Sequence, residues 1–105
     1  MPFAAGAGTI ISMITLKSIP VPDPAIASQY LDGEAVLVHP LRGKVKVLNA
    51  AGARIWQALD GHNTVAEIAD HLCGFFDVPL ETAEQDALRF VQNLADREFV
   101  TFLDQ

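Results

Sequence analysis

The sequence predicts an α+β domain with a three-stranded antiparallel sheet followed by three helices. Three short runs suited to extended structure occupy residues 26–48, and three runs with helical spacing of apolar residues follow between residues 49 and 97. A chain of 105 residues supports one modest core. We therefore expect the helices to pack together on one face of the sheet.

The first two strands are predicted as a hairpin. Residues 26–31 and 34–39 are β-rich runs separated by Asp32 and Gly33. An Asp-Gly pair between such runs is the strongest short-range signal for a two-residue hairpin.

A longer turn leads to the third predicted strand, residues 44–48. Within it, Val45 and Val47 lie on one side and Lys44 and Lys46 on the other. This period of two is typical of a sheet that is covered on one face.

The three predicted helices each carry a recognisable start or stop. The first begins after Asn49, a good N-cap, and ends before Gly61. The second opens with Thr64 and Glu67 at capping-box spacing, and the third spans about residues 80–97. The apolar positions expected to face the core are Ala51, Ile55, Trp56 and Leu59, then Val65, Ile68, Ala69, Leu72 and Phe76, and finally Ala87, Leu88, Val91, Leu94 and Ala95.

The second and third helices, joined through residues 76–79, resemble a helix-turn-helix beside a small sheet. The expected architecture is therefore winged-helix-turn-helix-like. Residues 99–102 are expected to form a short terminal strand or tail. Because such a fold serves both DNA readers and peptide binders, it does not decide the function by itself.

The N-terminal part, residues 1–24, is expected to be an apolar and then proline-rich lead-in to a domain spanning residues 25–105. Residues 20–24 hold three prolines, which fix φ and remove donors, so we expect no regular structure there. The run 9–16 could form a strand, and Met13 is an alternative start that would make the preceding residues an upstream extension. The N-terminus has no cationic n-region and is too short to span a membrane.

The charge distribution disfavours nucleic-acid binding. The net charge is −6, yet residues 42–48 carry Arg42, Lys44 and Lys46 without an acid. Residues 49–105, the helical part, hold ten acids against three arginines, a local balance of −7. Nucleic-acid binders instead concentrate basic residues on the elements that meet phosphate.

The residues capable of chemistry do not form a catalytic or metal-binding motif. His71 and Cys73 are two apart on a predicted helix, so they point to different faces and cannot chelate one ion together. A single cysteine excludes an internal disulfide and favours a reducing, cytoplasmic setting. We expect no catalytic residue, no metal and no cofactor. The residues considered as possible bases, nucleophiles or metal ligands are His39, His62, His71, Cys73, Glu81, Glu84 and Asp86.

The third strand and the last helix are the candidate binding elements. An edge strand leaves unpaired N–H and C=O groups, which are either protected or used to receive an extended peptide. Phe90 lies at the rim of the last helix, where it either closes the core or lines a groove against the strand. Lys44, Lys46 and Arg42 either protect that edge or attract an acidic ligand.

Several short motifs follow one another in a specific order. They are Leu48-Asn49, Ile55-Trp56, Leu59-Asp60-Gly61, Thr64 with Glu67-Ile68, and Asp86 before the last helical stripe. This joint order resembles the PqqD family over roughly residues 25–100. Members of that family are small peptide chaperones, also called RiPP recognition elements, that present ribosomally made precursor peptides to modifying enzymes.

The resemblance implies that a leader peptide adds as a further strand to residues 44–48 and lies against the last helix. The implied partners are a precursor peptide and a maturation enzyme such as a radical SAM protein or a leader peptidase, with neither nucleic acid nor membrane involved. The candidate peptide-binding residues are Arg42, Lys44, Val45, Lys46, Val47, Leu48, Ala83, Phe90 and Arg97.

The match departs from members acting in pyrroloquinoline quinone synthesis around residues 39–46 and at Trp56. Generic stand-alone members from other peptide pathways are more similar, and the pathway stays open between pyrroloquinoline quinone, a lasso peptide or another product. One alternative is a winged-helix regulator or scaffold that binds DNA or a protein. Another is a dimerisation unit driven by residues 9–16, including a homodimer in which this segment is swapped into the groove of a second copy.

Overall fold

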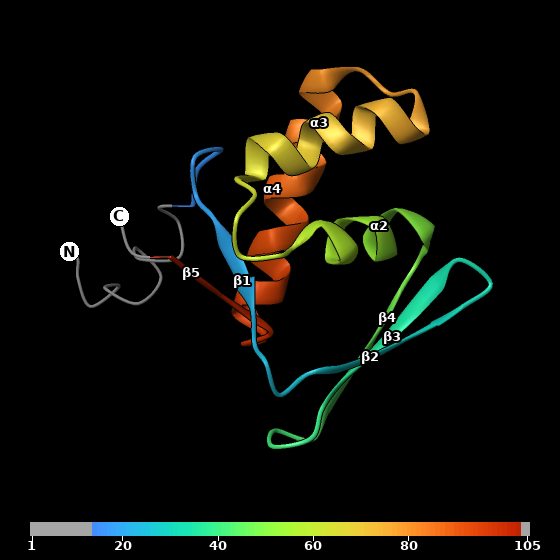
Figure 1. Ribbon diagram of the computed structural model, residues 1–105, viewed down its shortest axis with the longest axis vertical. Helices are drawn as coiled ribbons and strands as arrows, with labels where there is room; N and C mark the ends of the chain where they lie inside the picture. The colour runs from blue at the N-terminus through green and yellow to red at the C-terminus, as the bar shows by residue number, and fades with distance from the viewer. Residues whose placement is uncertain (1–13, 104–105) are drawn as a thin grey trace.

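The computed structural model describes residues 14–103 and confirms the predicted sheet followed by three helices (Figure 1). The main sheet is antiparallel in the order β2-β3-β4, and a second, two-stranded sheet pairs β1 with β5. Helix α2 packs against β3 and β4, and α3 packs against both α2 and α4 (Figure 1). The elements are β1 (Pro20–Pro22), β2 (Ala27–Leu31), β3 (Glu34–His39), β4 (Lys44–Leu48), α2 (Ala50–Ala58), α3 (Val65–Phe76), α4 (Leu80–Asp96) and β5 (Val100–Phe102).

The predicted hairpin between β2 and β3 is confirmed. Asp32 and Gly33 both adopt positive φ, at 54° and 82°, as a two-residue type I′ turn requires. Leu31 and Glu34 pair directly across this turn. This closing pair fixes which backbone groups of β3 point toward β2 and which point toward β4.

The predicted helix starts are also confirmed. The Asn49 side chain accepts a hydrogen bond from the Gly52 N–H at 2.9 Å and so caps α2. Thr64 and Glu67 form both hydrogen bonds of a capping box at the start of α3. Helix α4 begins at Leu80 as expected and ends one residue earlier than predicted.

The core lies between the inner face of the main sheet and the three helices. Most of the predicted apolar positions are buried, but Ala51 is exposed, while its neighbours Gly52 and Ala53 are buried. The buried hydrophobic residues are Ala35, Leu37, Leu48, Ala53, Ile55, Trp56, Leu59, Val65, Ile68, Ala69, Leu72, Ala83, Ala87, Val91, Leu94, Phe99 and Val100.

The prediction that the proline-rich segment lacks regular structure is wrong. Pro20–Pro22 forms β1, which pairs antiparallel with β5. Leu103 N donates to Ile19 O, and Asp23 N donates to Phe99 O, both at 3.0 Å. Because groups facing the partner alternate along a strand, the nitrogens of both prolines point away from β5, where no donor is needed.

Residues 14–24 pack against the helices. Val65 N donates to Ser18 O and Ala66 N donates to Leu16 O, both at 2.9 Å, and Pro20 is fully buried. The run 9–16 contains no strand in its described part, residues 14–16. Met13 and the rest of that run lie outside the residues that the structure describes.

A buried histidine joins this segment to the main sheet. The His39 side chain is 2% exposed, and its Nε2 lies 3.1 Å from Oδ2 of Asp23, just beyond β1. The ring also packs edge-to-face with Phe99, with centroids 5.9 Å apart. His39 is thus a structural residue that links three segments distant in sequence.

Candidate functional site

Strand β4 forms one edge of the main sheet. It pairs with β3 on one side, and within residues 14–103 no strand pairs with its other side. The other edge of the same sheet is β2. An exposed edge strand offers unpaired backbone groups to a further chain.

The hairpin register identifies the free groups of β4. Because Leu31 and Glu34 close a two-residue turn, the even-numbered residues of β3 direct their N–H and C=O groups to β2, and the odd-numbered residues direct theirs to β4. The β4 residues opposite the odd-numbered ones are Lys44, Lys46 and Leu48. The N–H and C=O groups of Val45 and Val47 therefore point to the open edge.

The side chains of β4 alternate between the two faces of the sheet as predicted, but the valines do not face the core. Leu48 is buried and shares its face with Lys46, whereas Val45 and Val47 are 62% and 65% exposed. The register explains this, since Lys46 lies opposite the fully buried Leu37 of β3. The lysines are thus on the helix side of the sheet and the valines on its outer side.

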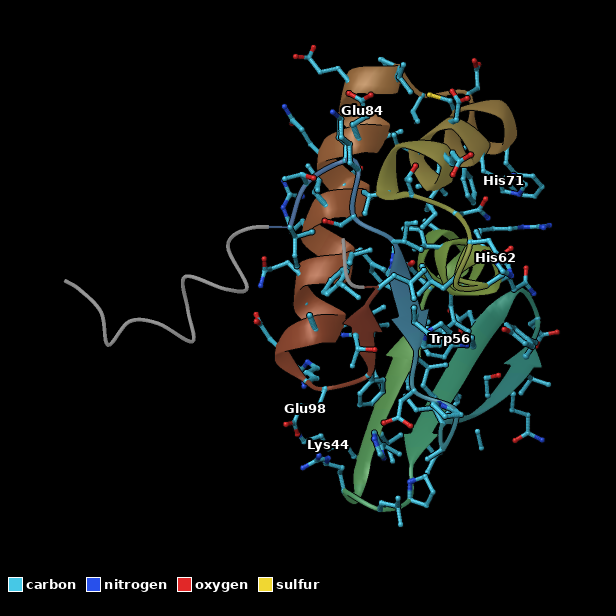
Figure 2. The ribbon with its side chains drawn as sticks, turned by 60° about the vertical axis from the view of Figure 1, so that its left-hand side comes forward. Lys44, Trp56, His62, His71, Glu84 and Glu98 are labelled. Carbon is cyan, nitrogen blue, oxygen red and sulfur yellow. The ribbon has the colours of Figure 1, made fainter. Side chains whose placement is uncertain are left out.

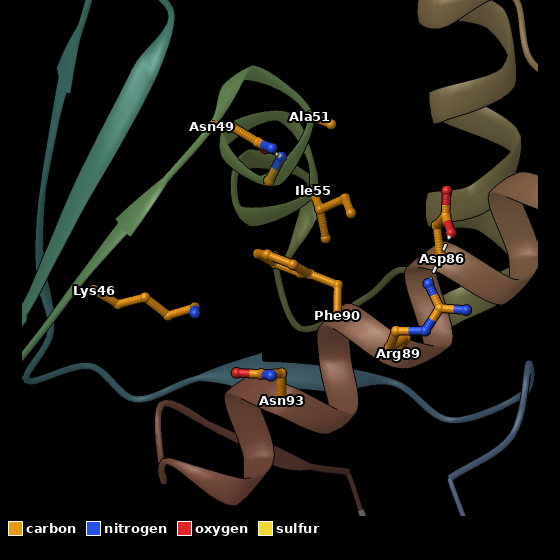
Figure 3. Close-up of a pocket in the computed structure, with 9 residues that line it drawn as sticks. Lys46, Asn49, Ala51, Ile55, Asp86, Arg89, Phe90 and Asn93 are labelled. Atoms are coloured by element: carbon orange, nitrogen blue, oxygen red, sulfur yellow. Dashed lines mark hydrogen bonds and ion pairs between the residues drawn. The ribbon is translucent and has the colours of Figure 1, made fainter.

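A cleft of ≈ 310 Å³ lies between the end of β4, α2 and α4 (Figure 3). Its floor is apolar where the Phe90 ring lies under Ile55 and against α2 (Figure 3). Phe90 is half-buried, so it both packs against the core and lines the cleft. The lining residues are Lys46, Asn49, Ala51, Gly52, Ile55, Asp86, Arg89, Phe90 and Asn93.

Gly52 determines how closely the Phe90 ring approaches α2. A Cβ atom at this position would lie 3.0 Å from Cε1 and 3.2 Å from Cζ of that ring. Only a residue without a side chain leaves Phe90 in its present place. Gly52 was not predicted as a site residue, although a glycine inside a helical pattern is a signal of close packing.

Two of the three cations predicted to attract a ligand to the edge strand, Arg42 and Lys44, already form contacts within the chain. Arg42 pairs with Glu98 at 3.1 Å. The Lys44 ammonium donates to the Arg97 carbonyl oxygen at 3.4 Å and lies 3.9 Å from the Glu98 carboxylate (Figure 2). These contacts join the start of β4 to the end of α4, below the cleft.

Lys46 differs from both. Its side chain points from β4 toward α4 (Figure 3), and its ammonium group makes no hydrogen bond or ion pair with any residue between 14 and 103. Asp86, at the opposite end of the cleft from Lys46 (Figure 3), is paired with Arg89 at 3.3 Å. Lys46 is therefore the cation left available for a ligand in the cleft.

The remaining predicted site residues lie in different places. Ala83 is 1% exposed and belongs to the core, so it does not form part of the groove wall. Arg97 is exposed at the end of α4, where its Nε donates to Asn93 Oδ1 at 3.1 Å. Of the predicted site residues, Lys46 and Phe90 line the cleft, and Val45 and Val47 lie on the open edge strand. The cleft residues that it missed are Asn49, Ala51, Gly52, Ile55, Asp86, Arg89 and Asn93.

The other titratable residues have structural or solvent-facing positions. His62 and His71 are exposed, and the half-buried Cys73 donates its S–H to Val78 O at 3.1 Å. The N–H groups of His62 and Asn63 hold the pKa of Asp60 below its usual value. Within residues 14–103, His, Cys, Asp and Glu form no group of three that could hold a metal ion.

The fold and site together define a small winged-helix-like domain whose sheet ends in an open edge beside an apolar cleft. The family model for coenzyme PQQ synthesis protein D (PqqD) matches residues 34–100. The chain therefore belongs to the PqqD family. The matched region contains β3, β4 and the helices α2, α3 and α4, and so includes every element that lines the cleft.

Three solved structures are similar to this chain. TbiB1 in complex with the TbiA(β) leader peptide is 32% identical, with a TM-score of 0.73 over 81% of this chain and 99% of that one. Lasso peptide synthetase B1 complexed with its leader peptide is 25% identical, with a TM-score of 0.70 over 79% and 98%. The PqqD truncation of Methylobacterium extorquens PqqCD, described as a stand-alone recognition element, shares the fold at 20% identity, with a TM-score of 0.73 over 87% and 97%. No curated protein matches the chain.

Proposed function

We propose that this chain is a non-catalytic peptide chaperone that binds the leader of a ribosomally synthesised precursor peptide by β-strand addition. The observation that carries the proposal is the open edge of β4 beside an apolar cleft. Family membership and the leader-peptide complexes of two similar proteins support the same class of ligand. A guest strand would gain main-chain hydrogen bonds from Val45 and Val47 and would place alternate side chains in the cleft.

The chemistry of maturation would belong to a partner. The cleft has an apolar floor and polar rim groups, which suit binding, and the proposal assigns the reaction to a modifying enzyme such as a radical SAM protein or a leader peptidase. This chain would present the leader to that enzyme and thereby raise the local concentration of the precursor.

The DNA-binding alternative is not favoured. The exposed side of α3 and the start of α4 carries acids, including Glu67, Asp70 and Glu81. These carboxylates would repel the phosphate backbone that dominates the affinity of DNA-binding proteins. The part of the chain that the structure describes also contains no helix that is long and apolar enough to cross a membrane.

A proline substitution at the open edge tests strand addition. Val47→Pro removes an N–H that points away from β3, so the existing sheet keeps its hydrogen bonds while a guest strand loses a donor. Ser28→Pro is the matched control. Ser28 lies between Ala27 and Gln29, whose backbone groups point to β3, so its own N–H points to the opposite free edge of the sheet, on β2. Leader peptides of precursor genes that neighbour the gene for this chain would be labelled and titrated by fluorescence anisotropy.

We expect Val47→Pro to weaken leader binding by about tenfold or more, since one hydrogen bond contributes ~1 kcal/mol and the proline ring obstructs the approaching strand. Ser28→Pro should leave the affinity unchanged. Far-UV circular dichroism and thermal unfolding would establish that both variants fold. Equal affinities for the two folded variants would contradict strand addition to β4.

A further inference from the structure

We infer that Lys46 selects the guest strand by its charge. The segment of the guest that binds β4 would carry an acidic residue flanked on both sides by β-branched or other apolar residues. This inference rests on the proposed strand addition and names the kind of leader segment that the site selects. It follows from the register of β4, the free ammonium of Lys46 and the two exposed valines.

The register determines which guest side chain meets Lys46. The backbone groups of Val45 and Val47 face the open edge, so a guest strand forms its hydrogen-bonded pairs with these two residues. The guest residue between them lies directly opposite Lys46 in a non-hydrogen-bonded pair. Side chains of directly opposed residues share one face, so this guest side chain points to the helix side, into the cleft beside Lys46.

The electrostatics of the cleft favour an acid at that position. Arg42 and Lys44 are engaged by Glu98 and by the Arg97 carbonyl oxygen. Lys46 has no such partner in the described part of the chain, and its side chain lines the cleft and points from β4 toward α4 (Figure 3). The acid already present there, Asp86, is offset by Arg89 at 3.3 Å. An opposite-charge pair across adjacent strands stabilises their association, whereas a like-charge pair opposes it.

The neighbouring guest positions face the other way. The guest residues opposite Val45 and Val47 project from the outer side of the sheet, beside valines that are 62% and 65% exposed. β-branched or aromatic side chains there would form cross-strand apolar pairs and cover these valines. The favoured guest segment is therefore apolar, acidic, apolar over three consecutive residues.

The same lysine discriminates against self-association through this edge. An antiparallel pairing of two β4 strands centred on Lys46 would set this residue directly opposite its own copy. Centring the pairing on Val45 would instead set Lys46 opposite Lys44 of the second copy. Both of these registers place like charges against each other, so Lys46 disfavours them relative to the binding of an acidic guest.

Selection of random twelve-residue peptides displayed on phage, against the full chain, tests the inference. We expect the selected peptides to be enriched in Asp or Glu with apolar neighbours on both sides. Selection against Lys46→Glu should replace the acid by Lys or Arg. Lys17→Glu is the matched control, because Lys17 is an exposed lysine whose neighbours are hydrogen-bonded to the start of α3, and it should leave the acid in place. Replacing the acid of a selected peptide by its amide should weaken binding by about fivefold in anisotropy titrations.

The outcomes separate this inference from the proposed function. Selected peptides that require the Val47 N–H and change their preferred charge with Lys46→Glu would support both. If the selected peptides lose binding to Val47→Pro, but selection against Lys46→Glu still enriches acidic peptides, charge selection by Lys46 would be contradicted. Strand addition to β4 would remain supported. Peptides that bind Val47→Pro as well as the unchanged chain would overturn both, since the site would then lie elsewhere.

Discussion

At the scale of single residues, Gly52 connects the packing of α2 to the shape of the cleft. The Phe90 ring lies so close to this position that a methyl group would contact it at 3.0 Å. Phe90 would then have to rotate, and the adjacent cleft would accept it. The absence of one Cβ atom thus keeps the floor of the cleft open.

Gly52→Ala is therefore expected to reduce peptide affinity more than it changes stability. Alanine improves helix propensity by about 1 kcal/mol, while overpacking against Phe90 costs about 1–3 kcal/mol. Gly74→Ala is the matched control, since Gly74 lies in α3 with no atom within 4 Å of its added Cβ, and it should simply stabilise the fold. Urea unfolding and anisotropy titrations would measure both effects. Unchanged affinity in Gly52→Ala would show that the Phe90 position does not control the cleft.

The pair formed by Asp23 and His39 predicts how stability depends on pH. The Ala25 N–H at 2.8 Å, followed by the His39 side chain, lowers the pKa of Asp23 below its usual 3.8. A carboxyl whose pKa is lower in the folded state contributes stability that is present above the unfolded pKa and is lost as the pH falls through the folded pKa. Asp23→Asn should therefore flatten the loss of stability below about pH 4. Urea midpoints measured from pH 7 to pH 2 test this, and identical slopes for both proteins would contradict it.

At the scale of elements, the sequence predicted most of the structure because the signals were local. The turn at Asp32 and Gly33, the cap at Asn49 and the capping box at Thr64 each depend on a few neighbouring residues. The bounds of β3 and β4 match the prediction for the same reason. Such signals need no knowledge of the rest of the chain.

The direction in which β4 presents its side chains could not be predicted in this way. Apolarity alone would bury Val45 and Val47, yet the pairing of Lys46 with Leu37 sets the opposite orientation. The short β1 was missed because its prolines are tolerated only next to β5, which is about 80 residues away along the chain. Gly52 and Asn93 join the cleft only once α2 and α4 are packed together.

At the scale of the whole molecule, the two sheets have different structural roles. The main sheet and the helices form the core and the cleft, while the β1–β5 pair joins residues near the two ends of the described chain. Phe99 and Val100, at 0% and 3% exposure, are buried where these ends meet. Residues 16–23 are hydrogen-bonded to the start of α3 and to the β5 region, so this segment packs as part of the same folded structure.

A chain that begins at residue 25 should consequently be much less stable than the full chain. It would lose the fully buried Pro20, the hydrogen bonds from Asp23 N to Phe99 O and from Val65 N to Ser18 O, and the Asp23 partner of His39. We expect the free energy of unfolding to fall by at least about 3 kcal/mol, from burial and hydrogen bonding combined. Urea unfolding followed by Trp56 fluorescence would measure this, because the single tryptophan is buried in the core. An unchanged midpoint would mean that the main sheet and helices fold without β1, and that β5 is held by α4 alone.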